Sequence, residues 1–202
     1  MIAIINHGVG NLRSVLCALN RLGVEASLVS DASGVRRCEG IILPGVGAFS
    51  AAMNELSERD LSAILIDEAR RGKPLLGICV GHQLLFSGST EHGTHTGLDL
   101  VPGSVKRFAP GLKIPHMGWN RVKLAKDSVL FEGIDDNSYF YFAHSYYGEP
   151  ADGLAAAATT DYGPGFVSCV ACDNVFGVQF HPEKSGAQGL QVLLNFCRYS
   201  GC

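Results

Sequence analysis

Short apolar runs alternate with helically spaced apolar residues in the first half of the chain. A helix is predicted after the first run, with Asn11 as its N-cap and Gly23 as its stop, because apolar residues recur at helical spacing from Leu12. Further helices are predicted over Asp60–Arg71 and from Gly81 to Phe86. Strands are predicted at Ile2–Asn6, Glu25–Ser30, Gly40–Leu43 and Leu75–Ile78. This alternation predicts a doubly wound, mostly parallel α/β sheet that binds ligands at the carboxyl ends of its strands.

The second half of the chain shows strand patterns with few helical ones. Glycines and prolines separate the runs Ser104–Phe108, Arg121–Leu124, Ser138–Tyr147, Gly153–Thr160 and Phe166–Cys172. Asp173-Asn174 is typical of a hairpin turn before a last strand at Val175–Phe180, and a closing helix is predicted over Gln188–Tyr199. We therefore expect an antiparallel section beside the parallel core, within a single domain spanning residues 1–202.

The composition of the 202-residue chain is that of a globular protein, with 47% hydrophobic and 17% charged residues and a net charge of −3. Without a strongly basic stripe, nucleic acid and anionic membranes are poor candidate partners. The odd count of seven cysteines, with no secretory segment and no apolar run near ~20 residues, predicts a cytoplasmic protein with reduced thiols.

Cys79 is the first candidate for chemistry. It follows an apolar strand, precedes a predicted helix and has Gly77 and Gly81 two residues away on either side, which is the pattern of a nucleophile elbow. The start of the helix would favour the thiolate, and the Val80 N–H would be placed to stabilise an oxyanion. Taken alone, the same pattern fits a buried core cysteine equally well.

His181 and Glu183 supply a candidate base and its orienter. Pro182 biases His181 towards an extended conformation, in which residues two apart face the same side, so Glu183 is expected beside the imidazole. Alone, His-Pro-Glu also fits a structural histidine at a strand end. Together with Cys79 it predicts a triad: the thiol attacks an amide, and His181 carries the thiol proton to the leaving nitrogen.

Two sequence stretches resemble the signatures of class I, triad-type glutamine amidotransferases: Gly-Ile-Cys-Val-Gly-His-Gln at 77–83 and Gly-Val-Gln-Phe-His-Pro-Glu at 177–183. The resemblance implies a flavodoxin-like domain, hydrolysis of glutamine through a cysteinyl thioester, and no cofactor or metal. Pro-Gly-Val-Gly at 44–47 resembles the family's oxyanion strand, which implies that backbone N–H groups of Val46 and Gly47 hold the tetrahedral intermediate.

Other stretches are similar to one subfamily, the glutaminase subunits of imidazole glycerol phosphate synthase. They are residues 8–15, 115–120, 141–146 and the ending His-Pro-Glu-Lys-Ser at 181–185. The resemblance implies that ammonia passes to a TIM-barrel cyclase subunit in a heterodimer of histidine biosynthesis. The matching glutamine-pocket positions are Gly45, Gln83, Glu91, His144, Ser145 and Tyr146, and the matching interface positions are Asn11, Met117, Trp119, Tyr141 and Lys184.

Several of these positions have plainer alternatives. His144 lies in an apolar segment that a buried strand explains, Trp119 fits a core position, and Glu91 lies in a polar loop at 87–96 where solvation is the default. Cys169-x-x-Cys172 and the pair His92 and His95 do not have a further ligand at metal-binding spacing.

The sequence departs from the subfamily pattern at three positions, and three other functions remain open. Asn6-His7 stands where the subfamily pattern has Asp-Tyr, and His82 stands where methionine is usual. A non-catalytic scaffold would lack a triad residue, and a glutaminase serving another synthase, such as pyridoxal phosphate synthase, would lack the segments at 118–120 and 141–146. A hydrolase or peptidase of the same fold would need no partner. Because the 44–47 peptide is flexible, the isolated chain is predicted to be a slow glutaminase.

Overall fold

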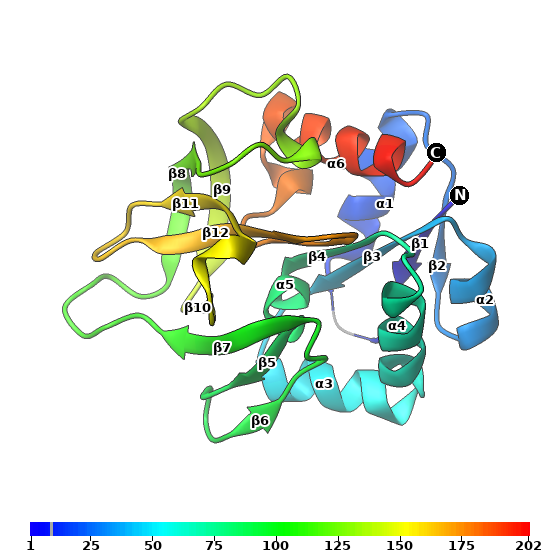
Figure 1. Cartoon of the computed structure of the whole chain (residues 1–202), viewed down its shortest axis with the longest axis horizontal. Helices are drawn as coiled ribbons and strands as arrows, with labels where there is room; N and C mark the ends of the chain where they lie inside the picture. Colours follow the sequence, from blue (N-terminus) through cyan, green and yellow to red (C-terminus); the bar gives the residue numbers. More distant parts are fainter. Residues whose placement is uncertain (9) are drawn as a thin grey trace.

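The structure is a computed structural model that describes residues 1–8 and 10–202, and its larger sheet runs through the whole described fold (Figure 1). Within the described residues this sheet has nine strands in the order β2-β1-β3-β4-β13-β12-β11-β8-β9. The strands are β1 Ile2–Ile5, β2 Ala26–Val29, β3 Gly40–Gly45, β4 Leu75–Cys79, β8 His116–Leu124, β9 Ser138–His144, β11 Ala156–Thr160, β12 Phe166–Cys172 and β13 Val175–Val178.

The larger sheet changes from parallel to antiparallel pairing at β13. β2, β1, β3, β4 and β13 are parallel and follow the order of flavodoxin-like sheets, whereas β12, β11, β8 and β9 continue antiparallel. β1 and β3 are buried along their whole length, as expected for parallel strands covered on both faces. The predicted α/β class, with an antiparallel section in the second half, is confirmed.

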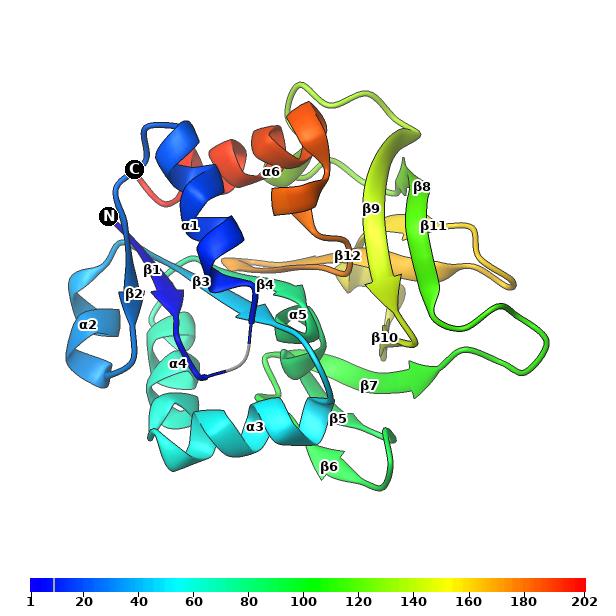
Figure 2. The same ribbon diagram turned by 180° about the vertical axis from the view of Figure 1, so that it is seen from behind.

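Helices cover both faces of the parallel part (Figures 1 and 2). One face carries α1 Leu12–Arg21 and α6 Gly186–Tyr199, and the other carries α2 Ala32–Arg37, α3 Phe49–Glu58, α4 Leu61–Arg70 and α5 Val80–Leu84. The prediction did not include α2 or α3. Asn11 is the N-cap residue of α1, as predicted, but its side chain contacts Ser14 Oγ and Glu183 Oε1 and makes no capping hydrogen bond to the helix backbone.

A smaller sheet packs beside the carboxyl ends of the parallel strands. Its order is β10-β7-β5-β6, with β5 Phe86–Ser89, β6 His95–Thr96, β7 Val101–Arg107 and β10 Tyr146–Pro150. The chain also contains short 3₁₀ turns: η1 Val129–Phe131, η2 Gly153–Ala155 and η3 Pro182–Lys184.

This sheet corrects two expectations. The predicted strand Ser138–Tyr147 breaks at Ser145, so that β9 stays in the large sheet and β10 begins the small one. The predicted helix from Gly81 to Phe86 ends at Leu84, and the stretch expected as a polar loop at 87–96 contains strand residues. Hydrogen bonds from Leu98 N to Leu84 O and from Val101 N to Leu85 O hold the chain in this path.

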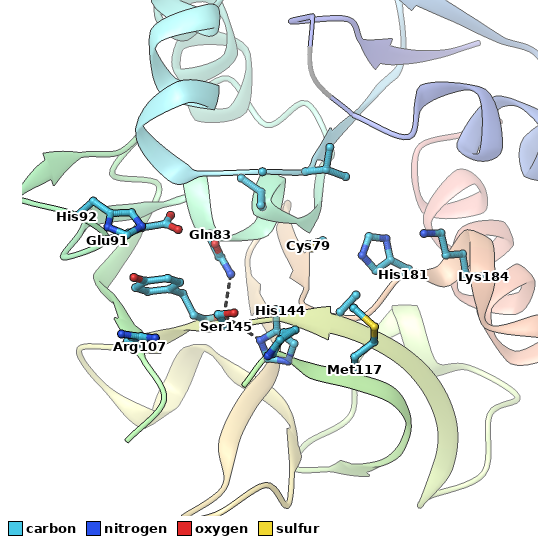
Figure 3. A pocket seen from close by; sticks show the side chains of 16 residues that line it. Cys79, Gln83, Glu91, His92, Arg107, Met117, His144, Ser145, His181 and Lys184 are labelled. Atoms are coloured by element: carbon cyan, nitrogen blue, oxygen red, sulfur yellow. Dashed lines mark hydrogen bonds between the residues drawn. The ribbon is translucent and has the colours of Figure 1, made fainter. Parts of the chain in front are cut away.

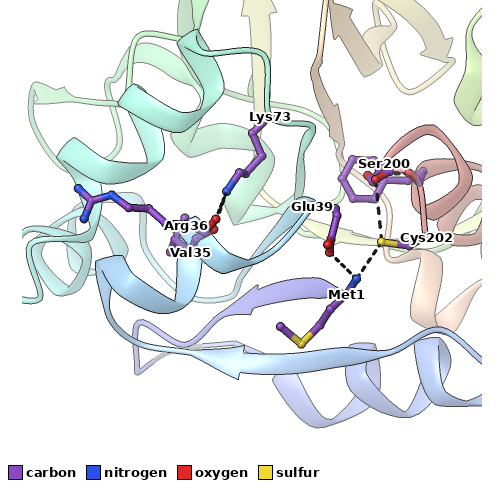
Figure 4. A network of polar contacts seen from close by, with 8 residues as sticks. Met1, Val35, Arg36, Glu39, Lys73, Ser200 and Cys202 are labelled. Carbon is purple, nitrogen blue, oxygen red and sulfur yellow. Dashed lines mark hydrogen bonds and ion pairs between the residues drawn. The ribbon is translucent and has the colours of Figure 1, made fainter.

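Polar contacts stabilise the fold at the amino ends of the parallel strands (Figure 4). Lys73 Nζ donates to the carbonyls of Val35, at 2.7 Å, and Arg36, at 3.1 Å, which satisfies the last turn of α2. The amino group of Met1 donates to Cys202 Sγ at 3.2 Å and pairs with Glu39, so the first strand and the segment after α6 lie together. Of the helices in the described part of the chain, none is long and apolar enough to cross a bilayer.

Candidate active site

A cavity of about 520 Å³ lies where the carboxyl ends of β3 and β4 meet the small sheet (Figure 3). It brings together residues from segments far apart in the sequence, as expected at the carboxyl edge of a parallel sheet. The predicted site residues that line it are Val46, Gly47, Cys79, Val80, Gln83, Glu91, Met117, His144, Ser145, Tyr146, His181 and Lys184. Gly45, Glu183, Asn11, Trp119 and Tyr141 were predicted too, but they lie outside the lining.

Cys79 occupies a strained turn between β4 and α5. Its backbone has φ 55° and ψ −110°, a region that residues with a side chain rarely adopt and that costs about 1–3 kcal/mol. The fold imposes this conformation because β4 pairs with β3 up to Cys79 itself, opposite Gly45, while α5 begins at the next residue. The turn presents the Cys79 side chain to the cavity, as predicted for a nucleophile elbow.

Close backbone approaches explain the glycines around this turn. A Cβ on Gly81 would lie 1.8 Å from the Leu43 carbonyl oxygen, and one on Gly77 would lie 2.6 Å from the Gly81 oxygen. Both distances are shorter than any side chain tolerates. Glycine is therefore required at both positions by the packing of α5 against β3 and β4.

His181 and Glu183 form a buried pair beside Cys79. His181 Nδ1 lies 3.0 Å from Glu183 Oε1, and the two side chains are 5% and 1% exposed. Burial by itself lowers the pKa of His181, but the hydrogen bonds and charges of Cys79 and Glu183 outweigh burial and raise this pKa to about 10. The imidazolium form of His181 is thus favoured at neutral pH.

The predicted local geometry of the pair was only partly right. His181 is extended, with φ −99° and ψ 96°, but Glu183 lies in the 3₁₀ turn η3 rather than in an extended segment. The turn brings the carboxylate back to the imidazole. Ser185, to which the sequence interpretation gave no role, secures the turn: its Oγ donates to His181 O at 2.6 Å and accepts from Tyr141 N at 3.0 Å.

Gln83 connects the thiol to the far wall of the cavity. Its Nε2 donates to Tyr146 O at 2.8 Å and to Gln179 Oε1 at 3.0 Å, and Gln179 Nε2 lies 3.9 Å from Cys79 Sγ. Gln179 belongs to the 177–183 motif, yet its type alone gave no indication of this contact. The chain of amides keeps the floor of the cavity polar next to the sulfur.

Glu91 lies on the opposite side of the cavity from His181 (Figure 3). It is 8% exposed, and its Oε2 accepts from Phe49 N at 2.7 Å, so the alternative of a solvated loop residue is wrong. The lining also includes His92 and Arg107, which no local pattern marks, and Pro115 and Ala143, which belong to the stretches at 115–120 and 141–146 but were given no role.

An exposed aromatic surface flanks the mouth of the cavity on β8 and β9. Met117 is 65% exposed, Trp119 56% and Tyr139 50%, so the alternative of Trp119 as a core residue is wrong. The Trp119 and Tyr141 rings meet edge to face at 6.2 Å, and Lys184 Nζ lies 5.9 Å from the Tyr141 ring centre. Lys184 and Met117 also line the cavity, so this surface is continuous with the site.

His7, a departure from the subfamily pattern, is buried, and its Nε2 donates to Pro44 O at 2.8 Å. The substitution therefore places a hydrogen-bond donor under the segment at 44–47. Val9, part of the motif at 8–15, lies outside the described residues. In the rest of the chain no group of three or more His, Cys, Asp or Glu side chains is placed to hold a metal.

His82 is fully buried, and within residues 1–8 and 10–202 neither ring nitrogen has a hydrogen-bond partner. Burial lowers its pKa to about 3, so it folds in the neutral form. Between its unfolded pKa of 6.5 and a pH of about 3 the unfolded chain binds the extra proton, so folding stability falls as the pH falls through this range.

We expect His82→Met to abolish this loss. The difference in free energy of unfolding between the variant and wild type should increase in favour of the variant as the pH is lowered from 7 to 5. The increase is about 2 kcal/mol in total, at about 1.4 kcal/mol per pH unit below 6.5. Urea unfolding at both pH values measures it. His92→Gln, at an exposed position, is the control and should leave the pH dependence unchanged. A constant difference between His82→Met and wild type would contradict the prediction.

The fold and this arrangement define a class of protein: an α/β domain with a cysteine in a strand–helix elbow beside a buried histidine–carboxylate pair. Residues 3–198 match the family described as glutamine amidotransferase class-I. The subunit HisH of imidazole glycerol phosphate synthase from Moorella thermoacetica is 51% identical, over 96% of this chain and 93% of its own length. The HisH subunit from Methanothermobacter thermautotrophicus is 48% identical, over 97% of this chain and 97% of its own length.

The solved structures agree on the fold. A crystal structure of a glutamine amidotransferase covers 100% of both chains with a TM-score of 0.80 at 20% identity. The structure of PurLQS from Thermotoga maritima gives a TM-score of 0.76 at 20% identity, covering 98% of this chain and 97% of the other. The chain therefore belongs to the class-I glutamine amidotransferases and, within them, to the family of imidazole glycerol phosphate synthase HisH subunits. The class and subfamily predicted from the sequence are confirmed.

Proposed function

We propose that Cys79, His181 and Glu183 are the catalytic triad with which this chain hydrolyses glutamine. The chain is a glutamine amidotransferase that serves histidine biosynthesis as the glutaminase subunit of imidazole glycerol phosphate synthase. The observation that carries the assignment of residues is the buried His181–Glu183 pair beside the strained Cys79, at one end of a cavity of about 520 Å³.

The geometry gives each triad residue a step. The Cys79 sulfur attacks the side-chain carbonyl carbon of glutamine, and His181 gives its proton to the nitrogen as the C–N bond breaks. Ammonia leaves, and a glutamyl thioester remains. His181 then takes a proton from water, whose oxygen attacks the thioester, and breakage of the C–S bond releases glutamate and the thiolate. Glu183, bound to Nδ1, fixes the imidazole and leaves Nε2 for the hydrogen bond with Cys79.

The rest of the cavity fits a glutamine molecule. The Glu91 carboxylate would bind the substrate's ammonium group, while Gln83, His144, Ser145 and Tyr146 would line its backbone end. Val46, Gly47 and Val80 line the cavity beside Cys79, where their N–H groups would stabilise the oxyanion. Gly45 would act indirectly: a Cβ there would lie 2.7 Å from Gly81 N, so glycine lets β3 approach the elbow.

We infer that the aromatic surface beside the cavity binds a cyclase subunit of TIM-barrel fold. The surface comprises Met117, Trp119, Tyr139, Tyr141 and Lys184. Asn11, the remaining predicted interface residue, has its Nδ2 3.5 Å from Glu183 Oε1. Exposed aromatic residues next to a long cation are typical of interface anchors. Because Met117 and Lys184 also line the cavity, a partner here would close its mouth and receive the ammonia directly.

Two broader properties follow as inferences. β13 pairs with β4 on one side and β12 on the other, which joins the parallel and antiparallel parts of the sheet and supports one domain over residues 1–202.

All seven cysteines are free thiols, which supports a reducing, cytoplasmic location.

The function is tested with glutamine labelled with ¹⁵N in its side-chain amide. The full chain is mixed with a cyclase subunit and its ribotide substrate, and glutamate release and ¹⁵N in the imidazole product are both measured. We expect the label in the product, and slow glutamate release from the chain alone. Unlabelled product, or equally fast hydrolysis without the cyclase, would contradict the coupled function.

The same assay tests the interface. Trp119→Ala should reduce stimulation by the cyclase at sub-saturating concentration about tenfold or more, the effect of losing an aromatic anchor. Tyr199→Ala removes a comparably exposed aromatic residue, 43% exposed on α6, and should leave the stimulation unchanged. Equal losses in the two variants would count against this surface as the docking site.

A further inference from the structure

Two buried histidines form a hydrogen-bonded relay behind the wall of the cavity. His116, on β8, and His144, at the end of β9, are 4% and 6% exposed, and His116 Nδ1 lies 2.9 Å from His144 Nε2. On the inner side, His144 Nδ1 lies 2.8 Å from Tyr146 O. On the outer side, Asn120 Nδ2 lies 3.2 Å from His116 Nε2 and 3.0 Å from Asp161 O.

The partners determine where every proton in the relay lies. Tyr146 O only accepts, so His144 Nδ1 carries a hydrogen and its Nε2 is bare in the neutral ring. His116 Nδ1 must then donate to that bare nitrogen, which leaves His116 Nε2 to accept from the Asn120 amide. Donation therefore runs in one direction, from Asn120 through His116 and His144 to the Tyr146 carbonyl.

Both histidines must be neutral for this order to hold, because protonating His144 would set two N–H groups against each other. Their surroundings favour the neutral forms. Burial lowers the pKa of His116 to about 4, and burial together with nearby histidines lowers that of His144 to about 3. The His116 ring stacks on Tyr162 at 4.0 Å and on Phe142 at 4.9 Å, which fixes its plane.

The end of the relay is the part of β10 that faces the cavity. Phe108 N donates to Ser145 O, and Tyr146 pairs with Arg107, so Tyr146 occupies a non-hydrogen-bonded position of the β10–β7 ladder. Its N–H and C=O therefore point away from β7, at the open edge of the small sheet where β10 is the last strand. The Tyr146 carbonyl accepts from both His144 and Gln83. The Tyr146 N–H points the same way, toward the part of the cavity that Gln83 lines.

We propose that His116 is a positioning residue for glutamine: by donating to His144 it fixes the Tyr146 carbonyl, and thereby presents the Tyr146 N–H to the substrate. The inference rests on the proposed glutamine site. His116 does not line the cavity, so it acts on the substrate only through His144 and Tyr146. It acts on binding rather than on the chemical step, because the relay ends on the pocket wall and not on Cys79 or His181.

The kinetic test compares two replacements of His116 in the full chain bound to the cyclase subunit. His116→Phe keeps a stacked ring but removes the donor, and we expect it to raise the KM for glutamine about tenfold while kcat changes less than about threefold. His116→Asn restores a donor near the position of Nδ1 and should bring KM back to within about threefold of wild type.

Phe166→Leu is the control for loosening of the aromatic cluster. The Phe166 ring packs against His116 at 5.8 Å and His144 at 5.0 Å without taking part in the relay. It should leave KM within about twofold of wild type. The proposal is overturned if His116→Phe has a wild-type KM, if His116→Asn is as impaired as His116→Phe, or if Phe166→Leu has the same effect.

A second measurement does not depend on activity or on the folding of a variant. Long-range ¹H–¹⁵N NMR of the wild-type chain alone reports which ring nitrogen carries the hydrogen. We expect the Nδ1–H form for both His116 and His144, and an Nε2–H form for either would overturn the relay. If glutamine is not hydrolysed by wild type but both rings show Nδ1–H, the proposed function fails and the relay stands as a structural feature.

Discussion

Glutamine hydrolysis by a Cys79→Ala variant is expected to fall by at least about 10⁴-fold, because no other group in the cavity replaces the thiolate as nucleophile. The substitution removes one sulfur from a turn that Gly45, Gly77 and Gly81 already shape, so the fold should be retained. Glutamate release at saturating glutamine measures the loss. Retained hydrolysis would remove Cys79 from the mechanism.

The same variant separates the two halves of the reaction. With the cyclase subunit, its ribotide substrate and added ammonium salt, Cys79→Ala should still support formation of the imidazole product at the wild-type rate. Cys172→Ala, at a partly buried cysteine near the end of β12, is the matched control and should keep full glutaminase activity. Loss of the ammonium-dependent reaction in Cys79→Ala would indicate a damaged complex rather than a missing nucleophile.

Gly81→Ala is expected to destabilise the protein by about 3 kcal/mol or more and to abolish activity. The new methyl group would lie 1.8 Å from the Leu43 carbonyl oxygen, so β3 and α5 would have to separate. That separation would displace both the Cys79 elbow and the 44–47 segment. Thermal and urea unfolding, together with glutaminase activity, measure the effect.

The control for this prediction is a glycine with open space around it. A Cβ on Gly153, in η2, would meet no atom within 4 Å, so Gly153→Ala should change the free energy of unfolding by less than about 0.5 kcal/mol. A Gly81→Ala variant as stable and active as Gly153→Ala would show that the elbow tolerates a side chain.

The parallel core was predictable because buried parallel strands leave a strong signal. β1, β3 and β4 are uninterrupted apolar runs, and the prediction placed each within one or two residues of its observed bounds. α3 was missed although Phe49, Ala52 and Leu56 are spaced for one buried helix face. α2 has only six residues including a glycine, and Asp31, whose side chain caps it through Gly34 N, was its one local signal.

The break at Ser145 was not predictable from local pattern, because the aromatic run continues across it. What ends β9 is distant: His144 turns its ring to His116 and to the Tyr146 carbonyl, and Phe108 N takes the Ser145 carbonyl into the small sheet. The triad could be proposed because its residues stand in short, specific motifs. Arg107 and His92 reach the cavity only through the folding of the small sheet, so no neighbouring residue marks them.

The position of β13 has a consequence for the order in which the protein is made. Gln179, which lies beside the thiol, follows Cys79 by 100 residues, and His181 comes later still. β4 leaves the ribosome long before β13 exists to pair with it, and contacts between such distant segments form late in folding. A nascent chain therefore carries Cys79 before His181, its proposed base, has been made. The proposed triad is complete only when β13 pairs with β4, so a chain that ends before β13 is expected not to hydrolyse glutamine.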